Sequence, residues 1–172
     1  MTNMKKTMTI DLIKQPTGNS CGPTCLKMIH SHIDMKYIYN EGYNRPSIEK
    51  ICDLCGTDWV VGTPPERMEK GMKALGLDYI EYVNIPNPYH FIIQILESEL
   101  RNIPLLRTIT KGVPHWIIVT EVINGEFKIN DPWQGNITYT EEELDAVWKP
   151  RNYQMFEVFR NSKTYKKHSN FR

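Results

Sequence analysis

The first part of the chain carries apolar side chains at the spacing of amphipathic helices. Apolar residues recur three and four positions apart from Cys21 to about Asp34, from Ile48 to Cys55, from Met68 to Leu75, and from Phe91 to Asn102. This spacing places them on one face of a helix. Ser47 precedes the second segment as an N-cap and Gly56 follows it as a C-cap. We therefore predict a helical first half, with a loop at residues 37–46.

After residue 102 the pattern changes to that of β-strands. We predict strands at residues 103–110, 115–123, 126–130 and 153–160, a short helix at 141–148, and earlier strands at 77–83 and 7–14. Asn124-Gly125 lies between two of these strands and is typical of a tight hairpin turn. The order predicts an α+β fold, in which a helical N-terminal half packs on an antiparallel C-terminal sheet, with a cleft between them.

Length, charge and cysteine content narrow the class of protein. The 172 residues suit a single domain at residues 1–160, followed by a basic, flexible tail at 161–172. A net charge of +1 gives no general attraction to nucleic acid or membrane, and no apolar run is long enough to span a bilayer or to form a secretory signal. The four cysteines are too few for a disulfide scaffold, so we expect reduced thiols in a cytoplasm.

Cys21 is the first candidate for chemistry. It follows the turn-rich segment 15–20 and begins the first predicted helix, where Asn19 or Ser20 can cap the helix and Pro23 suits its first turn. A thiol at this end of a helix lies beside unpaired backbone N–H groups and the positive end of the dipole, which favours the thiolate. The same N–H groups can receive an oxyanion. The alternative is that Cys21 is an ordinary buried residue.

His115 and Asp131 are the candidates to act on that thiol. His115 opens one predicted strand and Asp131 ends the next, and the tight hairpin between them places both at the end away from the turn. Each also lies on the same face of its strand as the neighbouring apolar residues. We therefore expect the carboxylate to orient the imidazole, whose second nitrogen accepts the thiol proton. His30 and His32 lie roughly 13 and 16 Å along the helix from Cys21, too far to contact it.

Gln15 is the fourth candidate. It lies six residues before Cys21, on the loop that leads into the helix. Its side-chain amide could donate to an oxyanion together with the Cys21 N–H, whereas a solvated loop glutamine is the ordinary alternative.

The segment Gln15 to Ile29 resembles the signature of the C39 peptidase-like family of papain-like cysteine proteases: a glutamine, five residues, then Cys-Gly-x-x-Cys. The resemblance continues in order to about residue 160, through Pro104-Leu105-Leu106, His115-Trp116-Ile117, Asp131-Pro132 and Trp148. It implies a papain-like fold with Cys21 as nucleophile, His115 as general base, Asp131 as orienting acid and Gln15 as oxyanion-hole donor. Many members have an aspartate where this chain has Ser20. The best-known members also precede a transporter and cut after a Gly-Gly pair, a specificity that we do not carry over.

We accordingly predict a cysteine peptidase that hydrolyses a peptide or isopeptide bond through a thioester, without metal or cofactor. Its expected partner is a peptide or protein substrate, contacted by Gly22, Trp116 and Trp133. Trp59 is a further candidate for the cleft, and core packing is the alternative for at least one of the three tryptophans. Two alternatives remain open: a papain-fold deamidase, transamidase or acyltransferase, and a binding module without activity.

A zinc site is the remaining alternative. Cys21, Cys25, Cys52 and Cys55 could bind one ion, and the second pair has suitable spacing. However, Cys52 and Cys55 complete the apolar stripe of a predicted helix, which favours core packing.

Overall fold

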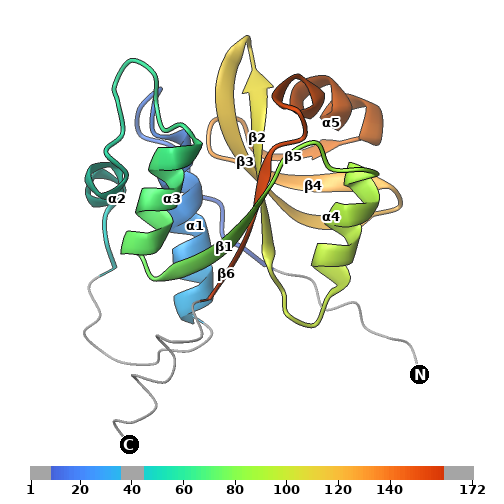
Figure 1. Cartoon of the computed structure of the whole chain (residues 1–172), viewed down its shortest axis with the longest axis horizontal. Helices are drawn as coiled ribbons and strands as arrows, with labels where there is room; N and C mark the ends of the chain where they lie inside the picture. Colours follow the sequence, from blue (N-terminus) through green and yellow to red (C-terminus); the bar gives the residue numbers. More distant parts are fainter. Residues whose placement is uncertain (1–8, 36–44, 161–172) are drawn as a thin grey trace, which may run out of the picture.

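The computed structural model describes residues 9–35 and 45–160, in which helices cover both faces of one sheet (Figure 1). One face carries α1 (Cys21–Met35), α2 (Ile48–Cys55) and α3 (Pro65–Ala74), and the other carries α4 (Pro88–Glu97) and α5 (Glu141–Trp148). The six antiparallel strands follow the order β1-β6-β2-β3-β4-β5. Their bounds are β1 (Leu77–Tyr82), β2 (Ile103–Thr110), β3 (Val113–Ile123), β4 (Glu126–Asp131), β5 (Gly135–Tyr139) and β6 (Met155–Arg160). The predicted α+β class is therefore correct.

Alternation along the strands separates two apolar cores. In β2, Leu105 belongs to the core beneath α1 to α3, whereas the next residue, Leu106, belongs to the core beneath α4 and α5. In β3, Ile118 belongs to the core beneath α1 to α3, and Ile117 belongs to the core beneath α4 and α5. Successive side chains of a strand point to opposite faces, so a sheet buried on both sides shows continuous apolar runs rather than strict alternation.

The capping signals of α2 act as predicted. Ser47 Oγ accepts a hydrogen bond from the Lys50 N–H, and Gly56 adopts the left-handed conformation at φ 69°. Cys52 and Cys55 are both buried on the apolar face of this helix. The sequence therefore locates the start, the end and the inward face of α2 correctly.

One predicted element is absent, and one predicted helix has different bounds. Residues 9–14 do not form the expected lead-in strand; this segment instead contacts β4 through the Asn130 side chain, whose Nδ2 donates to the Ile10 carbonyl at 2.7 Å. The fourth helix was expected at 91–102 but runs from Pro88 to Glu97. Pro88 suits the first helical turn, where no N–H is needed, and Ser98 is already extended.

Strand ends differ because positive-φ residues set the turns. β3 begins at Val113 rather than His115, directly after Lys111 and Gly112, which have φ of 50° and 79°. β6 begins at Met155 rather than 153, after Asn152 and Tyr153 adopt positive φ. β5 was not predicted, because its short sequence lacks a strong apolar alternation.

Some expectations lie beyond the described residues: the predicted tail at 161–172, most of the loop at 37–46 and the first two positions of the lead-in strand. In the parts of the chain that are described, no helix combines the length and hydrophobicity needed to cross a membrane.

Candidate active site

Cys21 is the first residue of α1, as its sequence context predicts. The turn before it is closed by Ser20, whose hydroxyl donates to the Thr17 carbonyl at 3.0 Å. The Ser20 carbonyl accepts the first helical hydrogen bond, from the Thr24 N–H at 2.9 Å. The first N–H groups of a helix have no partner within the helix. Cys21 therefore lies where backbone donors and the helix dipole can stabilise negative charge.

Gly22 allows α1 to approach the sheet closely. A Cβ at this position would lie 2.6 Å from Met68 Sδ and 3.2 Å from both Thr63 Cβ and Trp116 Cδ1. The absence of a side chain beside Cys21 therefore lets the helix tip pack directly against β3 and the start of α3. Gly22 was predicted to contact substrate; its surroundings give it a packing role as well.

His115 and Asp131 meet at the end of the β3–β4 hairpin, as predicted. The two strands pair in antiparallel register, with Ile118 opposite Asn130. His115 Nε2 lies 2.8 Å from Asp131 Oδ1, and the two residues are only 2% and 0% exposed. Because the carboxylate binds Nε2, it leaves Nδ1 as the ring nitrogen available to a second partner.

Asp131 is held in place by three further donors. The Trp133 and Gln134 N–H groups donate to Oδ1 at 2.7 and 3.0 Å, and Gln134 Nε2 donates to Oδ2 at 3.0 Å. Burial by itself would raise the pKa of Asp131, but the hydrogen bonds from His115 and Gln134 hold that pKa below its ordinary value. Sequence reasoning missed Gln134. Its position three residues after Asp131, in a turn that begins with Asp-Pro, is the signal that could have identified it.

His115 is linked to Cys21 as well as to Asp131. Burial would lower the pKa of His115, whereas the hydrogen bond to Asp131, a side-chain hydrogen bond to Cys21 and the charges of both raise it to about 9. The imidazole therefore interacts with both the thiol and the carboxylate. This is the arrangement that a cysteine nucleophile with a positioned base requires.

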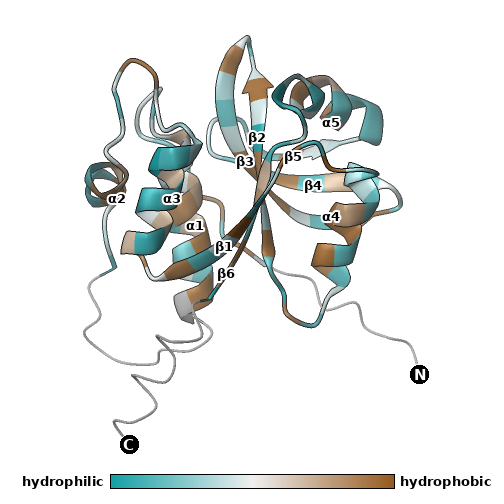
Figure 2. Cartoon of the chain, viewed as in Figure 1, coloured by the Kyte–Doolittle hydropathy of each residue, from teal (hydrophilic) through white to brown (hydrophobic). Residues whose placement is uncertain are grey.

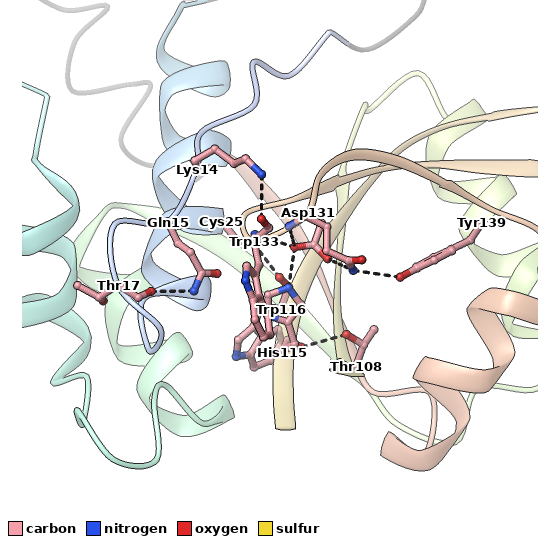
Figure 3. A network of polar contacts seen from close by, with 11 residues as sticks. Lys14, Gln15, Thr17, Cys25, Thr108, His115, Trp116, Asp131, Trp133 and Tyr139 are labelled. Carbon is pink, nitrogen blue, oxygen red and sulfur yellow. Dashed lines mark hydrogen bonds and ion pairs between the residues drawn. The ribbon is translucent and has the colours of Figure 1, made fainter. Parts of the chain in front are cut away.

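Gln15 is fastened to the same place by its backbone. Its N–H donates to the Pro132 carbonyl at 2.8 Å, and the preceding Lys14 donates through Nζ to the Trp133 carbonyl at 2.8 Å. The side-chain amide, however, donates from Nε2 to the Thr17 carbonyl at 2.7 Å (Figure 3). Its Oε1 is buried and has no hydrogen-bond partner among the described residues. Gln15 is therefore near the site, but its NH₂ group is bonded locally.

The predicted substrate-contacting tryptophans differ in exposure. Trp116 is 2% exposed, stacks on Phe156 and donates from Nε1 to the Thr63 carbonyl at 2.8 Å. This position corrects the expectation of a substrate surface, since the indole supports the site from within the core. Trp133 is 41% exposed and meets the His115 ring edge-on at a centroid distance of 6.1 Å. Trp59 is 62% exposed on the connection between α2 and α3.

All four cysteines are buried, and Cys21 is 6% exposed. Burial raises the pKa of Cys25 and Cys52, and it raises that of Cys55 to about 12. Cys25 Sγ contacts the Trp116 carbonyl at 3.4 Å. Across residues 9–35 and 45–160, no three His, Cys, Asp or Glu side chains are grouped as metal ligands, so the four thiols form no common site there.

Comparisons with known proteins agree with this architecture. The family model of the Peptidase C39 family matches residues 9–156. The peptidase domain of Streptococcus ComA, a bifunctional ABC transporter involved in quorum sensing, superposes with a TM-score of 0.67 at 16% identity, over 88% of this chain and 99% of that one. A double-glycine-motif protease from an AMS/PCAT transporter, in complex with its leader peptide, gives 0.65 at 16% identity, over 88% and 92% of the two chains. A C39-like peptidase from Bacillus anthracis gives 0.61 at 9% identity, over 89% and 96%. No significant sequence match is found among curated proteins.

Proposed function

Because this chain belongs to the Peptidase C39 family, we propose that it is a cysteine peptidase that hydrolyses a peptide or isopeptide bond with Cys21 as the nucleophile. The observation that supports this most directly is the buried His115–Asp131 hydrogen bond at 2.8 Å, together with the interaction of the same imidazole with Cys21 at the tip of α1. His115 and Asp131 come from one hairpin, and Cys21 comes from a helix about 95 residues earlier in the chain. Local folding alone therefore does not bring the three together.

The first step is proton transfer. His115 accepts the thiol proton of Cys21 through Nδ1, while Asp131 holds Nε2 and stabilises the imidazolium. The raised pKa of His115, about 9, favours the protonated ring at neutral pH. Sulfur then attacks the amide carbonyl carbon, and the carbonyl π electrons move to oxygen to give a tetrahedral oxyanion.

The oxyanion needs donors at the helix tip. The Cys21 backbone N–H is one, because the first N–H groups of α1 have no partner within the helix. Gln15 supplies the second donor. Its terminal amide rotates, so that Nε2 releases the Thr17 carbonyl and donates to the oxyanion instead. One such donor typically contributes about 2.7–4 kcal/mol to the transition state.

Collapse of the tetrahedral intermediate completes acylation. The C–N bond breaks, and the His115 imidazolium gives its proton to the leaving amine, which leaves an acyl thioester on Cys21. His115 then takes a proton from water, whose oxygen attacks the thioester. The C–S bond breaks, releasing the carboxylic acid and restoring the thiol. No step uses a metal or cofactor.

A peptide or protein is the proposed substrate. The neighbouring double-glycine-motif protease is a complex with a leader peptide, which supports a polypeptide substrate for this chain too. The sequence after which this chain cleaves is a separate question, since identities of 16% and below indicate the fold alone.

The free state of all four cysteines supports the proposed cytoplasmic location.

The test is cleavage of a proteome-derived peptide library, read by mass spectrometry as new termini. We expect new termini with the native protein, none with Cys21→Ala, and undiminished cleavage with Cys25→Ala, a matched cysteine one helical turn away. Side-chain deamidation or amine incorporation without new termini would show a deamidase or transamidase instead. Equal results for all three proteins would contradict a role for Cys21.

A further inference from the structure

Three consecutive apolar residues are exposed at the apex of the α2–α3 connection. Trp59, Val60 and Val61 are 62%, 89% and 66% exposed. We call these three residues the apex. Figure 2 shows hydrophobic colour at the top of this connection, and Figure 1 shows that the connection and the β2–β3 turn rise at the same end of the molecule. Isolated exposed apolar residues are ordinary, but three in a row on one loop indicate a surface that contacts something.

The backbone of the apex is fixed rather than loose. Asp58 and Gly62 pair across its base through two backbone hydrogen bonds of 3.0 and 2.8 Å. Asp58 Oδ1 accepts from the Val60 and Val61 N–H groups at 2.7 and 2.9 Å. These bonds use backbone atoms of the apex, so its side chains are free to contact another molecule. A preorganised loop of this kind loses little conformational entropy on binding.

The connection is tied to both halves of the candidate active site. On the nucleophile side, Asn19, two residues before Cys21, donates from its side chain to the Trp59 carbonyl. On the base side, Trp116, next to His115, donates from Nε1 to the Thr63 carbonyl at 2.8 Å. The apex is therefore held at a set place relative to the thiol and the imidazole.

Resting on the cysteine peptidase function proposed above, we propose that the apex binds bulky apolar side chains of the polypeptide substrate and so determines specificity. One residue, Ser20, separates Asn19 from Cys21, so two residue steps, one hydrogen bond and the two side chains limit the Trp59 carbonyl to roughly 17 Å from the thiol. An extended peptide rises about 3.3 Å per residue, so the apolar residues fall within about five positions of the cleaved bond.

Charge around the apex favours an apolar peptide over an anionic membrane surface. Loops that bind such surfaces combine apolar residues with basic ones. Here Arg67 lies 4.0 Å from Asp58 at the base of the apex, so the carboxylate balances the positive charge of Arg67. The neighbouring active site supplies the occupant, because a polypeptide that reaches Cys21 must pass close to Asn19 and the loop bonded to it.

The test compares native protein with a triple variant, Trp59→Ser, Val60→Ser and Val61→Ser. These changes retain every backbone hydrogen bond of the apex. The control is Leu100→Ser, an 80% exposed leucine on the α4–β2 connection. With the proteome-derived peptide library, we expect the native protein and the control to select leucine, isoleucine, valine or phenylalanine at a fixed position near the cleaved bond. The triple variant should lose that preference, and KM for a selected peptide should rise about tenfold, with a smaller change in kcat.

A binding arm separates this inference from the catalytic proposal. The same surface changes are made in Cys21→Ala protein, and library peptides that it retains are identified by mass spectrometry. Retention of apolar peptides that depends on the apex supports the inference even if the native protein cleaves nothing, a result that would overturn only the peptidase function. Cleavage with unchanged preference in the triple variant overturns the inference alone. Apex-dependent dimerisation, or binding to vesicles of anionic phospholipid without peptide retention, also overturns it.

Discussion

His115 Nε2 lies 2.8 Å from Asp131 Oδ1, with both side chains buried between the ends of two adjacent strands. This contact fixes which ring nitrogen faces Cys21, because the carboxylate occupies the other. Gln134 and the Trp133 N–H hold the carboxylate in turn. The orientation of the base therefore depends on a short turn that follows β4.

Asp131→Asn should reduce kcat on the order of 10²-fold, because the neutral amide stabilises the imidazolium less and permits the wrong tautomer. The matched control is Asp145→Asn, which also changes a carboxylate with two hydrogen-bond donors, Tyr89 and Tyr153, but lies on α5. Steady-state kinetics on a peptide selected from the library gives the measurement. An equal loss in both variants would mean that the effect is one of stability rather than orientation.

The rate should fall at high pH as His115 loses its proton. Because its pKa is raised to about 9, the imidazolium is present at neutral pH and disappears as the pH passes that value. Asp131→Asn removes a group that raises this pKa, so the falling limb of kcat against pH should move to lower pH. If the falling limb stays at the same pH in the variant, it reports the titration of a group other than His115.

Folding stability should depend on pH in the same direction. The folded-state pKa of His115, about 9, lies above the ordinary value of 6.5, so the folded protein binds this proton more tightly than the unfolded chain. The resulting stabilisation is complete below pH 6.5 and is lost as the pH rises through about 9. Urea unfolding across this range should give a falling free energy of unfolding, and the fall should be smaller in His115→Gln. A rise over the same range would contradict the assignment.

Iodoacetamide should label Cys21 faster than the other three cysteines, because His115 is placed to accept its proton. Burial raises the pKa of Cys25, Cys52 and Cys55, which keeps these three as unreactive thiols. Peptide mapping by mass spectrometry gives the labelling rate at each position. His115→Ala should slow labelling of Cys21 about tenfold or more, because Cys21 loses the base that accepts its proton. Equal, slow labelling of all four cysteines in the native protein would indicate a non-catalytic chain.

Gly22→Ala should destabilise the fold by about 1–3 kcal/mol, since the new methyl group would overlap the buried Met68 and crowd Trp116. It should also lower activity by displacing the helix tip that carries Cys21. Gly18→Ala is the matched control, because no heavy atom in the described structure lies within 4 Å of its added Cβ. Urea unfolding of both variants provides the comparison, and equal stabilities would show that α1 can shift without cost.

Gln15→Ala should reduce kcat by about 10²–10³-fold with little change in KM, if its amide turns from the Thr17 carbonyl to the oxyanion. Gln94→Ala, at an exposed glutamine on α4, serves as the control. Unchanged kcat would leave the role of Gln15 confined to the turn before α1.

The sequence by itself determined the local features of the site. A capping turn followed by Cys-Gly-Pro placed Cys21 at a helix start, and the Asn-Gly turn between two alternating strands placed His115 and Asp131 at one end of a hairpin. Helix starts and hairpin registers depend on hydrogen bonds between residues close in sequence, and such bonds leave a readable pattern.

Only the tertiary structure decided how these pieces meet. It brought Cys21 to His115, buried Trp116 that the sequence had assigned to a substrate surface, and directed the Gln15 amide to Thr17. It also supplied Gln134 and tied the exposed Trp59 loop to Asn19. These outcomes depend on packing and hydrogen bonding between segments distant in sequence, where small differences in side-chain direction determine the partner, and no local periodicity records them.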